Sequence, residues 1–247
     1  MNLIVLPSVD STNNYLQQLL NDGMAAEGTM VVGLEQTNGR GQRGNVWESA
    51  PGLGLYVSLL LEPVNWTVDK QFVLNKAIAV GIARYLETKT TADIRIKWPN
   101  DLMADGSKIS GVLIENNIRG SLISSIIVGI GINLNHPLFP NHYETPPVSL
   151  FRLTGVKYDA ENEAKELFRF VWLSYKQLMA GEQDWVEAEY AHRLYKRGEK
   201  AAFSQGEEIF FGVLQGVDDA GKALIRVNEV DEVYAHPSVR FYSPFRS

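Results

Sequence analysis

The chain has 247 residues, with 45% hydrophobic and 21% charged side chains, which is typical of a globular protein with one large domain, or one large and one small. Its formal net charge of −6 argues against a broad nucleic-acid-binding surface, so any bound anion needs a local cluster of positive charge. Cysteine is absent, which excludes disulfides, a thiolate nucleophile and cysteine-ligated metals and suits the reducing cytoplasm.

The sequence also gives no sign of a membrane span or an export signal. It contains no run of about 18 apolar residues. Its N-terminus lacks a basic segment followed by an apolar stretch and a cleavage site. We therefore expect a cytoplasmic protein that binds neither membranes nor nucleic acids.

The first predicted elements are a strand at residues 3–6 and a helix that ends at Gly23. Apolar side chains after Ser11 recur at helical spacing, and Asp10 or Ser11 is a natural N-cap. The free N–H groups of a helix N-terminus can also bind a polar ligand. Capping alone accounts for these residues, so both interpretations stay open.

Residues 29–35 are apolar and β-branched, which predicts a buried strand that leads into the Gly/Arg loop, residues 35–47. The loop reads E-Q-T-N-G-R-G-Q-R-G-N-V-W and matches neither G-x-x-x-x-G-K-[ST] nor G-x-G-x-x-G. Glycine lets the backbone approach a ligand, and arginine supplies a planar charge for phosphate or carboxylate. The pattern indicates an anion-binding loop, with Trp47 as a stacking surface for a flat heterocycle. The alternative is a mobile turn with solvated charges.

The next elements predicted are a strand at residues 56–61 and a helix at residues 71–86. The helix is apolar on much of its circumference, which indicates burial and a packing role. Residues 94–98 alternate between polar and apolar side chains, as a further strand does.

Pro99 stops that strand, and Asn100 and Asp101 follow it directly. A carboxylate at a strand end beside an anion loop could hold a Mg²⁺–nucleotide, although a simple turn is the alternative. Residues 109–115 predict the next strand, which we expect to form a hairpin with residues 94–98. Lys108 would enter from the turn of that hairpin, where a lone lysine is commonly solvated.

Residues 121–135 predict a buried strand in which Gly129 and Gly131 leave room for a close approach. Asn133 follows on this strand and offers amide hydrogen bonds, although an ordinary core strand with an asparagine turn explains it as well. Residues 136–147 are rich in proline and predict a loop, and the histidines show no metal-ligand spacing.

Two helices that cover a sheet are predicted at residues 161–179 and 184–195. Beyond Arg197 the pattern changes to short alternating runs separated by turns, which indicates an all-β segment of about fifty residues. We therefore predict two domains, residues 1–197 and 198–247. The predicted strands of the second are residues 209–214, 223–227, 232–235 and 239–242.

Five motifs taken together closely resemble those of the biotin–protein ligase family, and they occur in the same order. They are S-T-N, E-Q-T-x-G-R-G-x-R-G-x-x-W, K-W-P-N-D-L, K-I-S-G-V-L-I-E and G-I-G-I-N-L-N. The resemblance covers essentially the whole chain. It implies an α+β fold: a mixed β-sheet with helices packed on one side, like class II aminoacyl-tRNA synthetases, and a small C-terminal SH3-like β-barrel.

The resemblance also implies an activity in two steps. The carboxylate of biotin attacks the α-phosphate of Mg·ATP and gives biotinyl-AMP, and a lysine of a biotin carboxyl carrier domain then takes the biotinyl group. Such a reaction needs positive charge to bring two anions together and needs no enzyme nucleophile. ATP, Mg²⁺ and biotin are thus the expected ligands, and the carrier is the expected partner. Relatives occur as homodimers and as monomers.

Roles carried over by position fall into three groups. The biotin-binding residues implied are Ser11, Thr12, Asn13, Gln36, Gly39, Arg40, Gly41, Gln42, Lys108 and Gly111. The ATP-binding residues implied are Arg40, Arg43, Trp47, Asn100, Asp101 and Asn133. The catalytic residues implied are Lys108 as the main cation, Arg40 and Asp101, of which Asp101 is also a weak metal ligand beside the ATP phosphates.

This chain departs from the family pattern in two respects. Gln42 and Asn45 stand where many members have arginine, so we expect the loop to hold the adenylate less tightly. Some bacterial members also carry an N-terminal helix-turn-helix domain, whereas this chain enters the catalytic pattern by residue 11. We therefore expect a ligase and not a repressor.

Two other functions are weighed against this one. A lipoate–protein ligase shares the fold and the adenylation chemistry, but it predicts weaker matches to K-W-P-N-D and G-R-G. A non-catalytic sensor of biotin or an adenylate is the alternative from another class. The presence of both Asp101 and Lys108 argues against a sensor.

Overall fold

The computed structural model describes residues 1–140, 143 and 145–242, apart from the side chain of Arg43. Its larger part is a sheet of seven strands in the order β1-β2-β3-β7-β6-β5-β4. β1 and β2 run parallel and the other neighbours run antiparallel, which confirms the predicted mixed sheet. The strands are β1 (Asn2–Leu6), β2 (Thr29–Gly33), β3 (Gly54–Leu61), β4 (Ile94–Lys97), β5 (Asp101–Ala104), β6 (Ser107–Arg119) and β7 (Leu122–Asn133).

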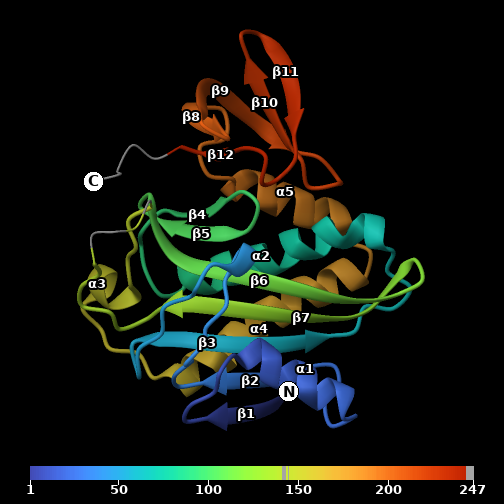
Figure 1. Ribbon diagram of the computed structural model, residues 1–247, viewed down its shortest axis with the longest axis vertical. Helices are drawn as coiled ribbons and strands as arrows, with labels where there is room; N and C mark the ends of the chain where they lie inside the picture. The colour runs from blue at the N-terminus through green and yellow to red at the C-terminus, as the bar shows by residue number, and fades with distance from the viewer. Residues whose placement is uncertain (141–142, 144, 243–247) are drawn as a thin grey trace.

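The larger helices, α2 and α4, cover one face of this sheet, and α1 lies on the other (Figure 1). Successive strand residues point to opposite faces of the sheet, so the residues of β2 pack against helices on both faces. Val32 belongs to the main core with α2 and α4, whereas Val31 packs against Leu16 of α1. The helices are α1 (Thr12–Asn21), α2 (Gln71–Glu87), α3 (Leu150–Thr154), α4 (Ala160–Met179) and α5 (Gln183–Arg193).

Helix α2 is the centre of the main core. It is buried on most sides because it contacts β4 and β5 of the sheet as well as α4 and α5. Its sequence predicted this environment, since apolar residues occupy nearly its whole circumference. The packing role expected for residues 71–86 is therefore confirmed.

The segment after α5 forms a second, antiparallel sheet in the order β11-β10-β9-β8-β12, seen at the top of Figure 1. This sheet is consistent with the predicted SH3-like domain. It meets the first part at Trp98, whose indole Nε1 donates to the carbonyl oxygen of Gly221 at 2.9 Å. The division at residue 197 stays a prediction. The strands are β8 (Lys200–Gln205), β9 (Glu208–Val217), β10 (Ala223–Val227), β11 (Val230–Tyr234) and β12 (Arg240–Phe241).

The predicted hairpin between residues 94–98 and 109–115 was wrong. β4 pairs with β5, and β5 then pairs with β6, so a four-residue strand lies between the two predicted ones. Asp101 begins β5 and is not merely part of a turn. Lys108 still follows a tight turn, because Asp105 and Gly106 both adopt positive φ angles, of 47° and 77°.

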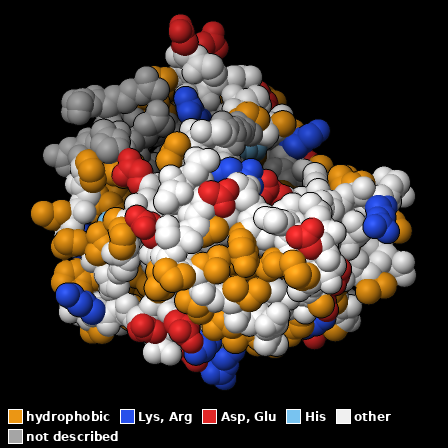
Figure 2. Space-filling model, turned by 60° about the horizontal axis from the view of Figure 1, so that its bottom comes forward, with side chains coloured by type: hydrophobic (Ala, Val, Ile, Leu, Met, Phe, Trp, Pro, Cys, Tyr) orange, Lys and Arg blue, Asp and Glu red, His pale blue; other side chains and the backbone are white. Residues whose placement is uncertain are grey.

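The surface carries both charged and apolar regions on the face shown in Figure 2. Positive and negative side chains lie close together in its hollowed middle, and hydrophobic side chains form a band below them. No helix in the described part of the chain has the length and apolar character required to cross a membrane.

Candidate active site

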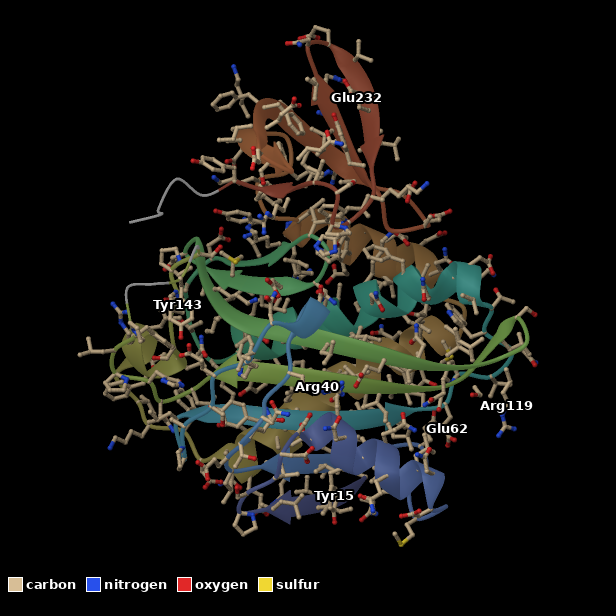
Figure 3. The ribbon with its side chains drawn as sticks, in the orientation of Figure 1. Tyr15, Arg40, Glu62, Arg119, Tyr143 and Glu232 are labelled. Carbon is tan, nitrogen blue, oxygen red and sulfur yellow. The ribbon has the colours of Figure 1, made fainter. Side chains whose placement is uncertain are left out.

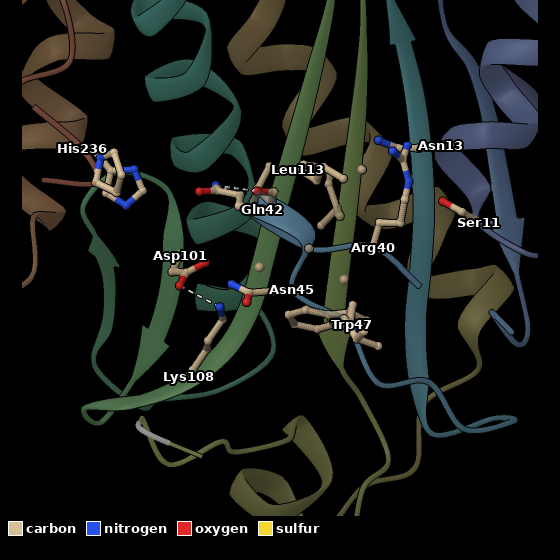
Figure 4. Close-up of a pocket in the computed structure, with 18 of the residues that line it drawn as sticks. Ser11, Asn13, Arg40, Gln42, Asn45, Trp47, Asp101, Lys108, Leu113 and His236 are labelled. Atoms are coloured by element: carbon tan, nitrogen blue, oxygen red, sulfur yellow. Dashed lines mark hydrogen bonds and ion pairs between the residues drawn. The ribbon is translucent and has the colours of Figure 1, made fainter. Parts of the chain in front are cut away.

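A pocket of about 470 Å³ lies between the Gly/Arg loop, the start of α1, β6 and β7 (Figure 4). It gathers residues from motifs that are far apart in the sequence. The predicted site residues that line it are Ser11, Thr12, Asn13, Gln36, Arg40, Gly41, Gln42, Trp47, Asp101, Lys108 and Gly111.

The start of α1 forms a polar end of this pocket. Gln36 Oε1 accepts hydrogen bonds from the backbone N–H and the hydroxyl of Thr12, at 2.9 and 3.1 Å. The hydroxyl of Ser58, on β3, lies between Thr12 Oγ1, at 2.8 Å, and Asn13 Oδ1. Ser11 occupies the N-cap position but makes no capping hydrogen bond with its side chain. Simple capping therefore does not explain Ser11, and the neighbouring polar groups are fixed in orientation.

Arg40 reaches from the loop to this same polar end. Its Nη2 lies 3.0 and 2.8 Å from the two carboxylate oxygens of Glu115, and Asn13 Nδ2 donates to Glu115 Oε2 at 2.7 Å. The positive charge of Arg40 also affects the pKa of Asp10. A hydrogen bond from Asn14 and, to a smaller extent, the charge of Arg40 hold the pKa of Asp10 below its usual value.

Two opposed glycines form a floor for the indole of Trp47. Gly111 on β6 pairs with Gly131 on β7. A Cβ at either position would lie 2.5 Å from an atom of the Trp47 ring, so only glycine leaves room for it. The indole Nε1 is buried and has no hydrogen-bond partner among the described residues. The ring therefore lies flat on the sheet, with a polar atom available to a ligand or a water.

Lys108 and Asp101 form the opposite end of the pocket (Figure 4). Lys108 Nζ donates to Asp101 Oδ2 at 2.7 Å and lies 5.6 Å from the centre of the Trp47 ring. The backbone of Lys108 is held by Pro146 and Val148, through hydrogen bonds of 2.8 and 2.9 Å. Both side chains are 30% exposed, so the ammonium group can still reach a ligand.

Gln42 connects the Gly/Arg loop to the strands beneath it. Its Nε2 donates to Asn100 Oδ1 at 2.8 Å and to the carbonyl oxygen of Val112 at 3.1 Å. Asn100 is only 4% exposed, so its amide reaches the pocket through Gln42. Gln42 therefore links the loop to the site through neutral hydrogen bonds.

Two other predicted site residues, Gly39 and Asn133, do not line the pocket. Gly39 closes the loop, because its carbonyl oxygen accepts the backbone N–H of Trp47 at 3.0 Å. Asn133 directs its Nδ2 to the carbonyl oxygens of Lys108 and Val148, so it supports the backbone that carries Lys108. The side chain of Arg43 lies outside the described residues.

Several residues around the pocket were missed by sequence reasoning. Glu115 and Ser58 lie in predicted strands whose pattern gives them no role, and only their contacts with Arg40 and Asn13 single them out. The second sheet also contributes to the wall, and no local pattern predicted this. Its pocket-lining residues are Ser204, Gly206, His236, Pro237, Ser238 and Arg240.

The arrangement suits reactions between anionic groups. Arg40 and Lys108 place permanent positive charge in the pocket, where it can stabilise charge that develops on a reacting group. Among the described residues, no group of three or more His, Cys, Asp or Glu side chains could hold a metal ion. Asp101 is the one carboxylate in the described wall, which fits a Mg²⁺ ion carried in by phosphates.

Comparison with known proteins gives a consistent result. The model of the biotin/lipoate A/B protein ligase family matches residues 5–133. The chain is 30% identical over 236 residues to the bifunctional ligase/repressor BirA of Bacillus subtilis, covering 94% of this chain and 72% of that protein. It is also 30% identical over 227 residues to a biotin–[acetyl-CoA-carboxylase] ligase from Paracoccus denitrificans, covering 90% and 93% of the two chains.

A solved structure extends this likeness to three dimensions. Biotin protein ligase from Aquifex aeolicus in complex with biotin and ATP superposes with a TM-score of 0.82 at 28% identity. The match covers 98% of this chain and 99% of that one, so it includes both sheets.

Proposed function

The chain belongs to the biotin/lipoate A/B protein ligase family and is a biotin–protein ligase, and we propose that it joins biotin to a carrier protein in two steps at this pocket. The observation that carries the proposal is the layout of the pocket. A fixed polar end made by α1 and Gln36 faces a cationic end made by Lys108. This layout matches a substrate with a polar ring at one end and a carboxylate at the other.

Biotin binds with its ring at the polar end. Thr12, Asn13 and Gln36 present donors and acceptors whose directions are already fixed by hydrogen bonds to one another and to Ser58. Fixed polar groups recognise a ligand at low entropic cost because they lose little freedom on binding. Ser11, which is 2% exposed, adds a hydroxyl to this set.

The carboxylate of biotin then reacts at the other end of the pocket. One of its oxygens attacks the α-phosphorus of ATP, the bond from that phosphorus to the bridging oxygen breaks, and pyrophosphate leaves with the electron pair. Lys108 lies between the two anions, reduces their repulsion and stabilises the charge on the phosphoryl oxygens. Asp101 holds Lys108 in place through the 2.7 Å ion pair.

The nucleotide occupies the part of the pocket next to the Gly/Arg loop. Trp47 offers a flat surface for adenine. Asn100 reaches this region through Gln42, and Asn133 supports the backbone of Lys108 beside it. Arg43 stays an expected ATP-binding residue. Asp101 is the residue that would hold Mg²⁺ together with the phosphates, and the ion would neutralise phosphate charge. Gly39 and Gly41 let the loop close over the adenylate.

In the second step an acceptor lysine attacks the acyl carbon of biotinyl-AMP. A carbon–nitrogen bond forms, the bond to the phosphate oxygen breaks, and AMP leaves. The relative from P. denitrificans is named a biotin–[acetyl-CoA-carboxylase] ligase, which supports a biotin carboxyl carrier domain as the acceptor.

Pyrophosphate release tests the first step and separates the two substrates of the family. Purified protein with ATP and Mg²⁺ is given biotin, lipoate or neither, and pyrophosphate is measured over time. We expect pyrophosphate to be released when biotin is present, and not with lipoate or with neither substrate. Release with lipoate and not with biotin would assign the chain to lipoate ligation, and biotin binding without release would indicate a sensor.

A further inference from the structure

Glu115 lies on the same side of the sheet as the pocket floor. It stands in β6 four residues after Gly111, and residues two apart on a strand face the same way. Leu113, midway between them, lines the pocket as Gly111 does. The strand register therefore directs the carboxylate of Glu115 toward the site, beyond the part of the floor that Trp47 covers.

One carboxylate contacts two predicted biotin-binding residues at once. Glu115 accepts hydrogen bonds from Arg40 Nη2 and from Asn13 Nδ2. Figure 3 shows Arg40 over the middle of the seven-stranded sheet. Glu115 thus joins the Gly/Arg loop to the start of α1, two segments that come from different parts of the chain.

The amide of Asn13 is held from both sides. Its Oδ1 lies against the hydroxyl of Ser58, and its Nδ2 donates to Glu115. A Cβ at Gly129 would lie 2.4 Å from Asn13 Oδ1, so the amide also fills the space above that glycine. Glu115 fixes which edge of the amide is the donor, because a carboxylate can only accept.

The ion pair between Arg40 and Glu115 is suited to orientation more than to stability. The side chains are 38% and 37% exposed, and exposed pairs contribute about 0–1 kcal/mol to folding. Within the described residues, only Nη2 of Arg40 makes hydrogen bonds. The other guanidinium donors are therefore free to meet a ligand while Glu115 holds the side chain in place.

We propose that Glu115 is a positioning residue for biotin, which orients Asn13 and holds Arg40 and its loop over the polar end of the pocket. This inference rests on the function proposed above. Without the carboxylate, biotin binding must bear the entropy cost of fixing the arginine and the loop, which a preformed contact avoids. Glu115 therefore acts on biotin through both Asn13 and Arg40, and on ATP through Arg40 alone.

Two variants separate the contacts of Glu115 with Arg40 and Asn13, and a third serves as the control. Glu115→Gln keeps an oxygen for Asn13 but loses the charge that holds Arg40, whereas Glu115→Ala loses both contacts. Glu166→Gln is the matched control, because it breaks another exposed Glu–Arg pair, with Arg169 on α4. Each protein is assayed for KM of biotin, KM of ATP, kcat of pyrophosphate release and melting temperature.

We expect Glu115→Gln to raise the KM for biotin about 5-fold and Glu115→Ala to raise it about 10-fold or more, as the loss of one or two charge-assisted bonds predicts. The KM for ATP should rise less than the KM for biotin, and the melting temperature should stay near that of the parent. Glu166→Gln should change none of these. An unchanged KM for biotin would overturn the proposal. A lower KM would show that Glu115 competes with biotin for Arg40.

A double-mutant cycle tests the route through Arg40. In an Arg40→Ala background, Glu115→Gln should no longer raise the dissociation constant of biotin, measured by calorimetry without ATP. The same increase in both backgrounds would contradict the proposed contact. If the parent protein itself fails to bind biotin, the proposed function fails; if the parent binds and Glu115→Gln is unchanged, only the inference on Glu115 fails.

Discussion

Lys108 Nζ and Asp101 Oδ2 lie 2.7 Å apart at the end of the pocket opposite Asn13, although the two residues belong to different strands. The contact depends on the short strand β5, which begins at Asp101 and pairs with β6 next to Lys108. The pair holds a partly exposed ammonium group at the place where we propose that the two anionic substrates meet. We therefore expect adenylation to depend on Lys108 more than on any other side chain.

Replacing Lys108 should damage adenylation more than any other single change. Lys108→Ala removes a charge-assisted contact to the reacting groups, and a loss of about 1–3 kcal/mol predicts a fall in kcat of about 5- to 150-fold. Pyrophosphate release measures this, with Lys165→Ala on the surface of α4 as the control. A loss of under about threefold would contradict the role of Lys108.

Adding a side chain to the glycine floor beneath Trp47 should weaken substrate binding. Gly131→Ala places a Cβ 2.5 Å from the Trp47 ring, so the indole must leave its position. We expect the KM values for biotin and for ATP to rise about 10-fold. The loss of stability should be small, because the added methyl group meets a side chain and not backbone. Gly216→Ala is the control, because a Cβ there meets nothing within 4 Å. Equal kinetics of the two variants would remove the proposed role of the floor.

Gln42 should control how long the intermediate stays bound. Gln42→Ala removes two hydrogen bonds that tie the Gly/Arg loop to Asn100 and Val112, each worth about 0.5–1.5 kcal/mol. We therefore expect biotinyl-AMP to dissociate about 5-fold faster, measured by chasing preformed complex with unlabelled ligand. Gln177→Ala, outside the pocket, should leave this rate unchanged. A normal dissociation rate in Gln42→Ala would show that the loop does not retain the intermediate through this side chain.

The second sheet should affect the nucleotide through Trp98. Trp98→Phe removes the indole N–H that donates to Gly221, so the segment leading to Asn100 and Asp101 loses one anchor. We expect a loss of about 1 kcal/mol in stability and a rise in the KM for ATP, with little change for biotin. Trp66→Phe loses an indole hydrogen bond of similar length, the exposed one to the carbonyl oxygen of Lys70, and serves as the control for KM. Equal KM values for ATP in both variants would show that the Trp98 contact contributes to stability and not to nucleotide binding.

Glu27 predicts a dependence of stability on pH. Burial alone would raise its pKa, but hydrogen bonds from Tyr175 and Lys176 outweigh burial and hold the pKa below the usual 4.5. In acid the unfolded chain therefore binds more protons than the folded one, so this stabilisation is complete above pH 4.5 and is lost as the pH falls through the folded pKa.

Glu27→Gln should accordingly lower the free energy of unfolding by about 1–3 kcal/mol at neutral pH. The difference from the parent should shrink below pH 4.5, where Glu27 becomes protonated. Urea denaturation at several pH values measures both proteins. A difference that stays constant down to pH 3 would show that the effect comes from packing and not from the charge of Glu27.

Much of the fold could be predicted because its strands and helices carry strong patterns. The strands β6 and β7 and the apolar circumference of α2 could be recognised from composition and period, although the pairing of β6 with β7 could not. β5 was missed because four residues between a proline and a turn are too few to show a period. This omission also produced the wrong hairpin.

The site residues that belong to short motifs could be predicted. Those whose role depends on contacts between distant parts of the chain could not. Arg40, Asp101 and Lys108 were found in short, unusual stretches of sequence, and the pocket brings them together with Asn13 and Gln36. Their roles stay predictions.

Two kinds of contributor could not be found from the sequence. Glu115 ends the K-I-S-G-V-L-I-E motif, but the motif gives it no role, and its significance comes from contacts with residues 75 and 102 positions away. The second sheet reaches the pocket through Arg240 and its neighbours, for which no local signal exists.

Transfer of biotin to a carrier domain is the decisive test of the proposed function. Purified protein is mixed with ATP, Mg²⁺, biotin and a biotin carboxyl carrier domain, and the intact mass of the carrier is measured. We predict a gain of one biotinyl group that disappears without ATP and with Lys108→Ala. A carrier whose mass stays unchanged under the complete conditions, or changes only when lipoate replaces biotin, would contradict the account.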